Sequence, residues 1–293
     1  MNCLFVGAGA VGITTAHDLA RRGADVTVYE RDAVASGASG RAAGVCYDAF
    51  ASRPDATLGR EAIERFREFA AEGAPFTPCP YVWLAREGDE DRIRLLREGI
   101  DRMRDLGGNA EELDATELTA RFPALRGSDV AIAGLTPTAG FTDPGAYTAW
   151  LAAQARAEGA TIREQTPVEL TADPPGVRPA TGAGAGQRWR QTPDTLVVAA
   201  GARSKQLLAD AGIALAMKPY RVQALVGAVP SAWAEQVAPG TAAEPPVSVA
   251  QSSGTDELSD WGPMWYDASA DCYARPHPDG LLAGNGTEPV EAD

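Results

Sequence analysis

Three glycines near the start of the chain have the spacing of a phosphate-holding turn. They form the pattern Gly7-x-Gly9-x-x-Gly12 directly after the apolar run Asn2–Val6. In such a turn Gly7 permits the sharp exit from a strand, Gly9 admits a pyrophosphate close to the main chain, and Gly12 lets a helix pack on the sheet. The unpaired N–H groups of that helix start favour an anion. The residues expected at the pyrophosphate are Gly7, Ala8, Gly9, Ala10, Val11 and Gly12.

An acid follows the next strand, at the position from which a ribose is held. Val26–Tyr29 is β-branched and aromatic, and it ends at Glu30, 18 residues after Gly12. A carboxylate at this point accepts a hydrogen bond from a ribose 2′-OH and repels a 2′-phosphate, which disfavours NADP. Strand, glycine turn, helix, strand and acid in this order predict a dinucleotide-binding unit, the alternative being the same fold without a ligand.

The loop after this acid favours FAD over NAD. It reads Ser36-Gly37-Ala38-Ser39-Gly40-Arg41-Ala42-Ala43-Gly44, whereas a simple NAD dehydrogenase normally continues into a helix. We expect the loop to fold over the same pyrophosphate, with Arg41 beside Ser39 and with small residues that let main chain approach a flavin. A flexible surface loop is the alternative interpretation. The further residues expected at the cofactor are Arg31, Ser36, Ser39, Gly40, Arg41, Ala42, Ala43 and Gly44.

Together these motifs resemble the D-amino-acid oxidase superfamily of FAD-dependent oxidoreductases, to which glycine oxidases, sarcosine oxidases and D-amino-acid dehydrogenases belong. Three later stretches resemble the same family: Phe141-Thr142-Asp143-Pro144 before a helix, Thr195–Ala202, and Tyr273–Gly280. The resemblance implies an FAD cofactor. It also implies that Ala200 and Gly201 return to the cofactor and that the main chain of Val168 lies against the adenine.

The resemblance further implies an α/β fold, in which a Rossmann-type FAD-binding domain carries an inserted α+β substrate domain on a mostly antiparallel sheet. Both domains would be discontinuous, residues 1–77 plus 138–214 and residues 78–137 plus 215–293. The family continues past the Arg275 turn with a strand and a helix that cover the flavin. We therefore expect a truncated chain, a partner chain that supplies the remainder, or a degenerate relative.

Local patterns predict the main elements of both domains. Helices are expected at 57–72, 89–106, 114–122 and 145–158, and strands at 78–85, 130–135, 160–165 and from 168 onward. Residues 173–187 and 230–246 are rich in Pro, Gly or Ala and are expected to be loops. Residues 261–266 hold two Trp and one Tyr, which indicate a buried strand or, alternatively, an aromatic wall beside the substrate.

The resemblance implies oxidation of the C–N bond of an amino acid or an N-methylated amine by hydride transfer to flavin N5. A guanidinium binds a carboxylate best, through two parallel N–H···O bonds. Arg275 is the first candidate for this contact and Arg221 the second, and Tyr273 and Tyr220 are candidate hydrogen-bond donors to the same substrate. For any one arginine, a surface ion pair is the alternative. An NAD-dependent dehydrogenase and a non-catalytic cofactor-binding subunit remain the rival functions.

Composition excludes several classes of partner. Forty acidic and 26 basic residues give a formal charge of −14, which disfavours nucleic acid and anionic lipid. No apolar run reaches the length of a membrane span, and four scattered cysteines with two histidines are neither a disulfide framework nor a metal set. Lys205 and Lys218 are the only lysines, a bias typical of halophilic proteins and of GC-rich genomes. We expect a cytoplasmic protein that acts on a small molecule.

Overall fold

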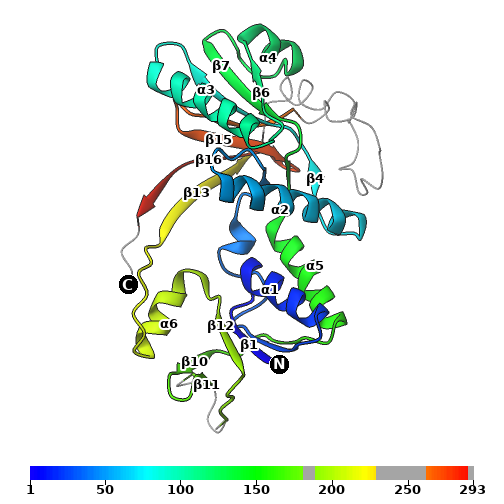
Figure 1. Cartoon of the computed structure of the whole chain (residues 1–293), viewed down its shortest axis with the longest axis vertical. Helices are drawn as coiled ribbons and strands as arrows, with labels where there is room; N and C mark the ends of the chain where they lie inside the picture. The colour runs from blue at the N-terminus through cyan, green and yellow to red at the C-terminus, as the bar shows by residue number, and fades with distance from the viewer. Residues whose placement is uncertain (181–188, 229–261, 290–293) are drawn as a thin grey trace. The chain divides into compact units, whose positions relative to one another are not determined.

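The computed structural model of the chain describes residues 1–180, 189–228 and 262–289 (Figure 1). Packing divides the chain into two compact units. The first unit comprises Met1–Ala43, Asp143–Pro219 and Pro289–Asp293, and the second comprises Gly44–Thr142 and Tyr220–Glu288.

The unit boundaries differ from the predicted domain ends at one main place. Residues 44–77, which the sequence assigned to the cofactor domain, pack within the second unit. Arg67 in this segment donates a hydrogen bond to the carbonyl of Thr138, and Arg60 donates one to the carbonyl of Leu106. These long-range bonds have no local signal in the sequence, so the amphipathic pattern of the segment did not reveal its partner.

The first unit is an α/β layer built on a parallel sheet. Its sheet has the order β12-β1-β2-β9, with all three pairings parallel. Helices α1 and α5 pack against each other (Figure 1), while an antiparallel β10-β11 hairpin covers Leu4 and Val6. In chain order the elements are β1 (Asn2–Val6), α1 (Ala10–Arg21), β2 (Asp25–Tyr29), η1 (Ser39–Arg41), α5 (Pro144–Ala157), β9 (Thr161–Arg163), β10 (Val168–Thr171), β11 (Gly176–Pro179), β12 (Thr195–Val198), η2 (Gly201–Arg203) and α6 (Ser204–Asp210).

The second unit is built on a mostly antiparallel sheet. Its seven strands have the order β13-β16-β15-β14-β5-β7-β6, and the β14-β5 pair is parallel. A small sheet, β3-β8-β4, lies in the same unit. In chain order the elements are β3 (Val45–Cys46), α2 (Arg53–Ala71), β4 (Thr77–Pro78), β5 (Tyr81–Arg86), α3 (Glu90–Asp105), β6 (Glu111–Leu113), α4 (Ala115–Arg121), β7 (Val130–Thr136), β8 (Gly140–Phe141), β13 (Tyr220–Gly227), β14 (Met264–Asp267), β15 (Cys272–His277) and β16 (Gly280–Pro289).

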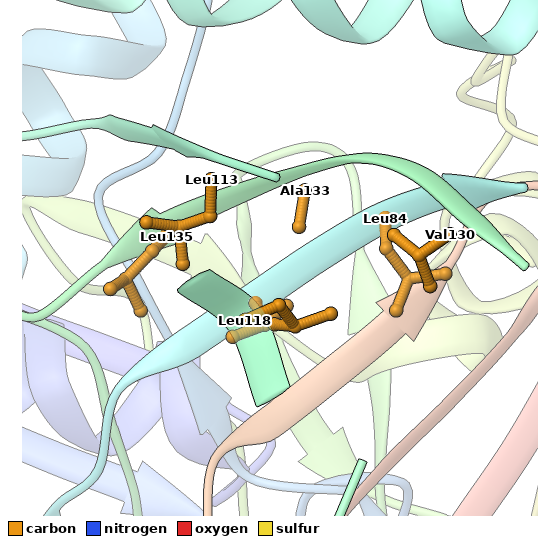
Figure 2. Packing of buried hydrophobic residues seen from close by; sticks show 7 residues of the cluster. Leu84, Leu113, Leu118, Val130, Ala133 and Leu135 are labelled. Carbon is orange, nitrogen blue, oxygen red and sulfur yellow. The ribbon is translucent and has the colours of Figure 1, made fainter. Parts of the chain in front are cut away.

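Alternation along β5 gives the large sheet two apolar faces. Val82 and Leu84 point to one face, where Leu118 of α4 lies among side chains of β5, β6 and β7 (Figure 2). Trp83 and Ala85 point to the other face and pack with the helix α3. This is the α/β fold with an α+β second unit that the sequence predicts, and the prediction is confirmed.

Most predicted elements are present, with shifted ends. The helix predicted from residue 57 begins at Arg53, because Ser52 caps it and Pro54 occupies its first turn. The strand predicted at 78–85 spans Tyr81–Arg86. Three predictions fall partly or wholly outside the described residues, at 181–187, at 230–246 and at Trp261. Among the described residues, no helix combines the length and apolar character needed to cross a membrane.

A buried carboxylate links two strands of the second unit, β14 and β5, and the turn that follows β14. Asp267 is 2% exposed, accepts hydrogen bonds from the main-chain N–H groups of Ser269 and Ala270, and binds Arg86 Nε at 2.6 Å. We expect Asp267→Ala to lower the free energy of unfolding by about 2–4 kcal/mol, because two main-chain N–H donors lose their acceptor and Arg86 is left with its ion pair to Asp129. Urea unfolding followed by circular dichroism measures this change.

The exposed pair of Asp91 and Arg94 provides the matched control. Their side chains are 88% and 58% exposed, so we expect Asp91→Ala to cost less than about 0.5 kcal/mol. Equal unfolding curves for the two variants would show that Asp267 does not stabilise the sheet.

Candidate functional site

The glycine turn at the end of β1 is packed against the end of β12. Gly7 has φ +109°, a conformation that L side chains rarely adopt. A Cβ at Gly7 would lie 2.4 Å from the carbonyl oxygen of Ala199, and a Cβ at Gly12 would lie 2.2 Å from the carbonyl oxygen of Gly7. These two glycines therefore hold α1 against the sheet, at the point where β1 has β2 on one side and β12 on the other.

Gly9 has a different environment from the other two glycines. It is the N-cap residue of α1 with extended φ and ψ of −79° and 178°. Among the residues that the structure describes, a Cβ there would meet only the Ser39 Oγ atom, at 3.0 Å. That oxygen accepts a hydrogen bond of 2.9 Å from Ala10 N. Val11 in the next position is 74% exposed. The first turn of α1 thus presents main chain and an open surface, as a pyrophosphate site requires.

The Glu30 carboxylate is fixed beside the glycine turn. Its Oε2 atom accepts a 2.8 Å hydrogen bond from Ala8 N, and its Oε1 atom accepts a 2.9 Å bond from Asp32 N. Each carboxylate oxygen has two lone pairs, so each retains one for a further donor. Two hydroxyl groups on neighbouring carbons of a ribose supply such donors.

The loop after β2 is tied to the same turn by main-chain bonds. Ala35 has φ +60°, its N–H donates to the carbonyl of Ala8 at 3.0 Å, and its own carbonyl accepts from Gly40 N at 2.9 Å. A Cβ at Gly40 would lie 2.4 Å from that carbonyl oxygen. The loop therefore brings Ser39 to α1 because residue 40 is a glycine.

The other residues predicted at the cofactor fall into two groups. Near the turn, Ala200 Cα lies 2.9 Å from the Cβ that Gly7 lacks, and Gly201 follows it. In the second group, Arg31 pairs with its neighbour Asp32 and is 46% exposed. Val168 is buried in a cluster with Val6 and Tyr29, the residues directly before Gly7 and Glu30.

Arg41 and the small residues of the loop complete the predicted cofactor set. Arg41 Nη1 donates to the carbonyl of Ser36, which closes the loop on itself. Ala42 is exposed, and Ala43 is the last residue of the first unit, directly before Gly44. A dinucleotide fits these residues, because a glycine cradle, a helix start and a carboxylate with spare lone pairs lie within one compact unit.

Two of the predicted catalytic residues share one face of the second unit's large sheet. Tyr273 and Arg275 are two positions apart on β15, so their side chains point the same way. The Tyr273 hydroxyl lies 2.5 Å from the Cβ position that Gly284 of β16 leaves free. Arg275 is 4% exposed, with its guanidinium carbon 4.8 Å from the centre of the Phe141 ring and its Nη1 bonded to the carbonyl of Pro276.

The other two predicted catalytic residues lie on β13, beyond β16 in the strand order. Tyr220 is 57% exposed, and Arg221 is exposed as well. As neighbours in a strand they point to opposite faces, so the two are not brought together.

Two thiols border the buried guanidinium. Burial raises the pKa of Cys46 to about 12, and the positive charge of Arg275 opposes this shift. Burial likewise raises the pKa of Cys79 to about 12, and a main-chain hydrogen bond with Met264 and the charge of Arg275 oppose it. Both thiols remain protonated at neutral pH, so neither is a nucleophile.

Sequence reasoning did not single out three residues that shape these sites. Asp32 supplies an N–H to Glu30, Ala35 adopts a left-handed conformation, and Phe141 covers the Arg275 guanidinium. A left-handed alanine leaves no trace in composition. The motif that contains Phe141 was visible, but only the fold shows its ring over the arginine.

Comparison with known proteins identifies the family. The family model DAO, described as FAD dependent oxidoreductase, matches residues 4–293. No curated protein sequence matches.

Solved structures show the same fold at low identity. L-proline dehydrogenase from P. horikoshii is 23% identical with a TM-score of 0.81, over 100% of this chain and 71% of that one. Glycine oxidase from Geobacillus kaustophilus is 23% identical with a TM-score of 0.76, over 99% and 72%. Iminodiacetate oxidase from Chelativorans sp. BNC1 is 22% identical with a TM-score of 0.69, over 99% and 72%.

The family match decides between the two cofactors that the sequence had left open, in favour of FAD over NAD. The chain belongs to the DAO family of FAD dependent oxidoreductases, and it is an enzyme whose cofactor is FAD.

Proposed function

We propose that the chain oxidises the C–N bond of an amino acid or N-methylated amine, with the bound FAD supplying the hydride acceptor at N5. The family match over residues 4–293 carries the proposal. The similar structures add to it, because proline, glycine and iminodiacetate all join an amine to a carbon that bears a carboxylate.

In this proposal the first unit holds FAD. The main chain of Gly9 and the start of α1 face the pyrophosphate, and Ser39 bridges the loop to Ala10. Glu30 accepts hydrogen bonds from the ribose hydroxyls, since its two oxygens each keep a lone pair.

The second unit holds the substrate. Arg275 donates hydrogen bonds to the substrate carboxylate and Tyr273 donates one from its hydroxyl, which fixes the direction of the Cα–H bond. Burial of Arg275 strengthens its attraction for an anion, because the surrounding dielectric is low. The amine first loses a proton to solvent, and the flavin would accept hydride from a carbon bonded to nitrogen. Water then hydrolyses the resulting iminium: an amino acid oxidised at Cα gives a keto acid and ammonia, and an N-methyl group gives formaldehyde and the demethylated amine.

Anaerobic titration of the purified chain tests this function. We expect a flavin absorption spectrum that bleaches when an amino acid or N-methylated amine is added. L-α-Glycerophosphate is the alternative compound to test, because L-α-glycerophosphate oxidase from Mycoplasma pneumoniae has a similar fold. If only this compound bleached the flavin, the substrate would be an alcohol and not an amine. A flavin that no compound reduces would make the chain a cofactor-binding subunit.

We also propose that the protein works in the cytoplasm. Its four cysteines, Cys3, Cys46, Cys79 and Cys272, are free thiols, and thiols persist in a reducing compartment. The formal charge of −14 fits a halophilic cytoplasm.

A further inference from the structure

Three aromatic rings of the second unit form a continuous stack that is only half-buried. The ring centre of Tyr47 lies 5.1 Å from that of Phe50 and 4.8 Å from that of Tyr81, with both pairs stacked. All three residues keep partial exposure, unlike the fully buried side chains of the sheet core. We call Tyr47, Phe50 and Tyr81 the aromatic wall.

The wall is held in place by contacts that fix its backbone. Between Tyr47 and Phe50, the Asp48 Oδ1 atom accepts hydrogen bonds from the hydroxyls of Thr138, at 2.8 Å, and Thr136, at 3.2 Å. The Phe50 ring fills the space that Gly59 of α2 leaves open, since a Cβ there would lie 2.8 Å from it. A surface fixed in this way loses little conformational entropy when a ligand packs on it.

The wall adjoins the predicted carboxylate site. Tyr47 and Tyr81 pack against a buried cluster that contains Phe141, and the Phe141 ring lies 4.8 Å from the Arg275 guanidinium carbon. Phe141 pairs with Val45 in the small sheet. The Phe141 ring therefore contacts the cation, and the rings of Tyr47 and Tyr81 pack against the cluster that contains Phe141.

Chain connectivity keeps the wall near the cofactor loop. Tyr47 is three residues after Gly44, and three residues of fully extended chain span at most about 10 Å. The Gly44 carbonyl accepts a hydrogen bond of 2.9 Å from Thr142 N. Thr142 is the residue after which the chain returns from the second unit to the first. Tyr47 therefore lies within about 10 Å of Gly44, the first residue of the second unit.

The chemistry of the wall is that of a neutral, apolar surface. Burial raises the pKa of Tyr47 and of Tyr81 above the usual phenol value, so both rings stay uncharged at neutral pH. We propose that the aromatic wall is the subsite for the substrate's side chain, and that it selects amino acids or N-methylated amines with an apolar, ring-sized side chain. This inference rests on the proposed function, with Arg275 holding the carboxylate and the wall receiving the group on Cα.

Binding of two amine-free carboxylates to the FAD-bound protein tests the subsite apart from oxidation. We expect calorimetry to show that 3-phenylpropionate binds at least tenfold more tightly than propionate. In Tyr47→Leu this ratio falls to below threefold, whereas Tyr47→Phe, which keeps the ring, preserves it. Steady-state kinetics with phenylalanine and alanine, each as D and L isomer, gives a second measurement. We expect Tyr47→Leu to lower the ratio of kcat/KM for phenylalanine to kcat/KM for alanine, mainly by raising KM for phenylalanine.

The matched control is Phe66→Leu. Phe66 also stacks on a ring of the second unit, Phe76, with centres 5.5 Å apart, but it is not part of the wall. We expect it to keep the native ratio, and unchanged FAD absorbance and thermal midpoint show that each variant is folded. Equal binding of the two carboxylates to the native protein, or a preference that survives Tyr47→Leu, overturns the subsite. Ring selection without flavin reduction by any amine leaves the subsite standing and refutes the proposed oxidation.

Discussion

A Gly9→Val variant is expected to purify folded but colourless, whereas Gly12→Val is expected not to fold. The Cβ at Gly9 would meet only a hydroxyl that can rotate away, and the extended φ of −79° suits any residue. The Cβ at Gly12 would lie 2.2 Å from a main-chain oxygen that cannot move. Valine at position 9 keeps the pyrophosphate from the main chain, which costs one or two charge-assisted hydrogen bonds of about 1.5–3 kcal/mol each.

The measurement is the ratio of flavin to protein absorbance, together with circular dichroism for the fold. A hundredfold loss of FAD affinity corresponds to about 2.7 kcal/mol, within the expected range. Gly99→Val in the second unit is the control, because no atom of another described segment lies within 4 Å of its added Cβ. A yellow, folded Gly9→Val protein would remove the glycine turn from the cofactor site.

Arg275→Ala is expected to lower kcat/KM by about 1.5–3 kcal/mol, which is roughly a tenfold to hundredfold loss, mainly through KM. The guanidinium is 4% exposed and stacked on Phe141, so an anion bound there is shielded from water. Lysine keeps the charge but not the paired N–H geometry, and Arg275→Lys should recover only part of the loss.

Steady-state kinetics with the best substrate of the titration measures this effect. The FAD content of the same variants reports on folding, because Arg275 is not among the residues proposed to bind FAD. Tyr273→Phe removes one hydroxyl from the same sheet face and should cost less, about 0.5–1.5 kcal/mol. Native kinetics in Arg275→Ala would refute its contact with the substrate and leave it as the cation over Phe141.

Local sequence signals were sufficient for the start of the first unit, but β11 (Gly176–Pro179) lies in a segment predicted as a loop and α6 was not predicted. Apolar run, glycine turn, helix and acid are consecutive in the chain, so β1, α1, β2 and Glu30 were all predicted in order. The helix opened by Asp143 was predicted as well, since an Asp N-cap followed by Pro144 is a local signature, and α5 has this start. The capping box of Asp114 and Glu117 marks α4 in the same way.

The pairing of strands that are distant in the chain could not be predicted from the sequence. β14 joins β5 in parallel, with Trp265 opposite Val82, and no pattern in either strand names its neighbour. The same limit applies to the candidate site. The sequence could select Arg275 by residue type and strand position, but its burial under Phe141 depends on a small sheet assembled from three separate segments.

Two main-chain hydrogen bonds shape the loop that contains Ser39 and Arg41. The Ala35 N–H donates to the carbonyl of Ala8, and the Gly40 N–H donates to the carbonyl of Ala35. Because the loop is already ordered in the folded protein, the entropic cost of ordering it is part of the free energy of folding and does not weaken cofactor binding. Under the proposed function, retention of FAD is therefore thermodynamically linked to the integrity of the first unit. Substitutions that loosen its sheet weaken flavin retention even at positions remote from the glycine turn.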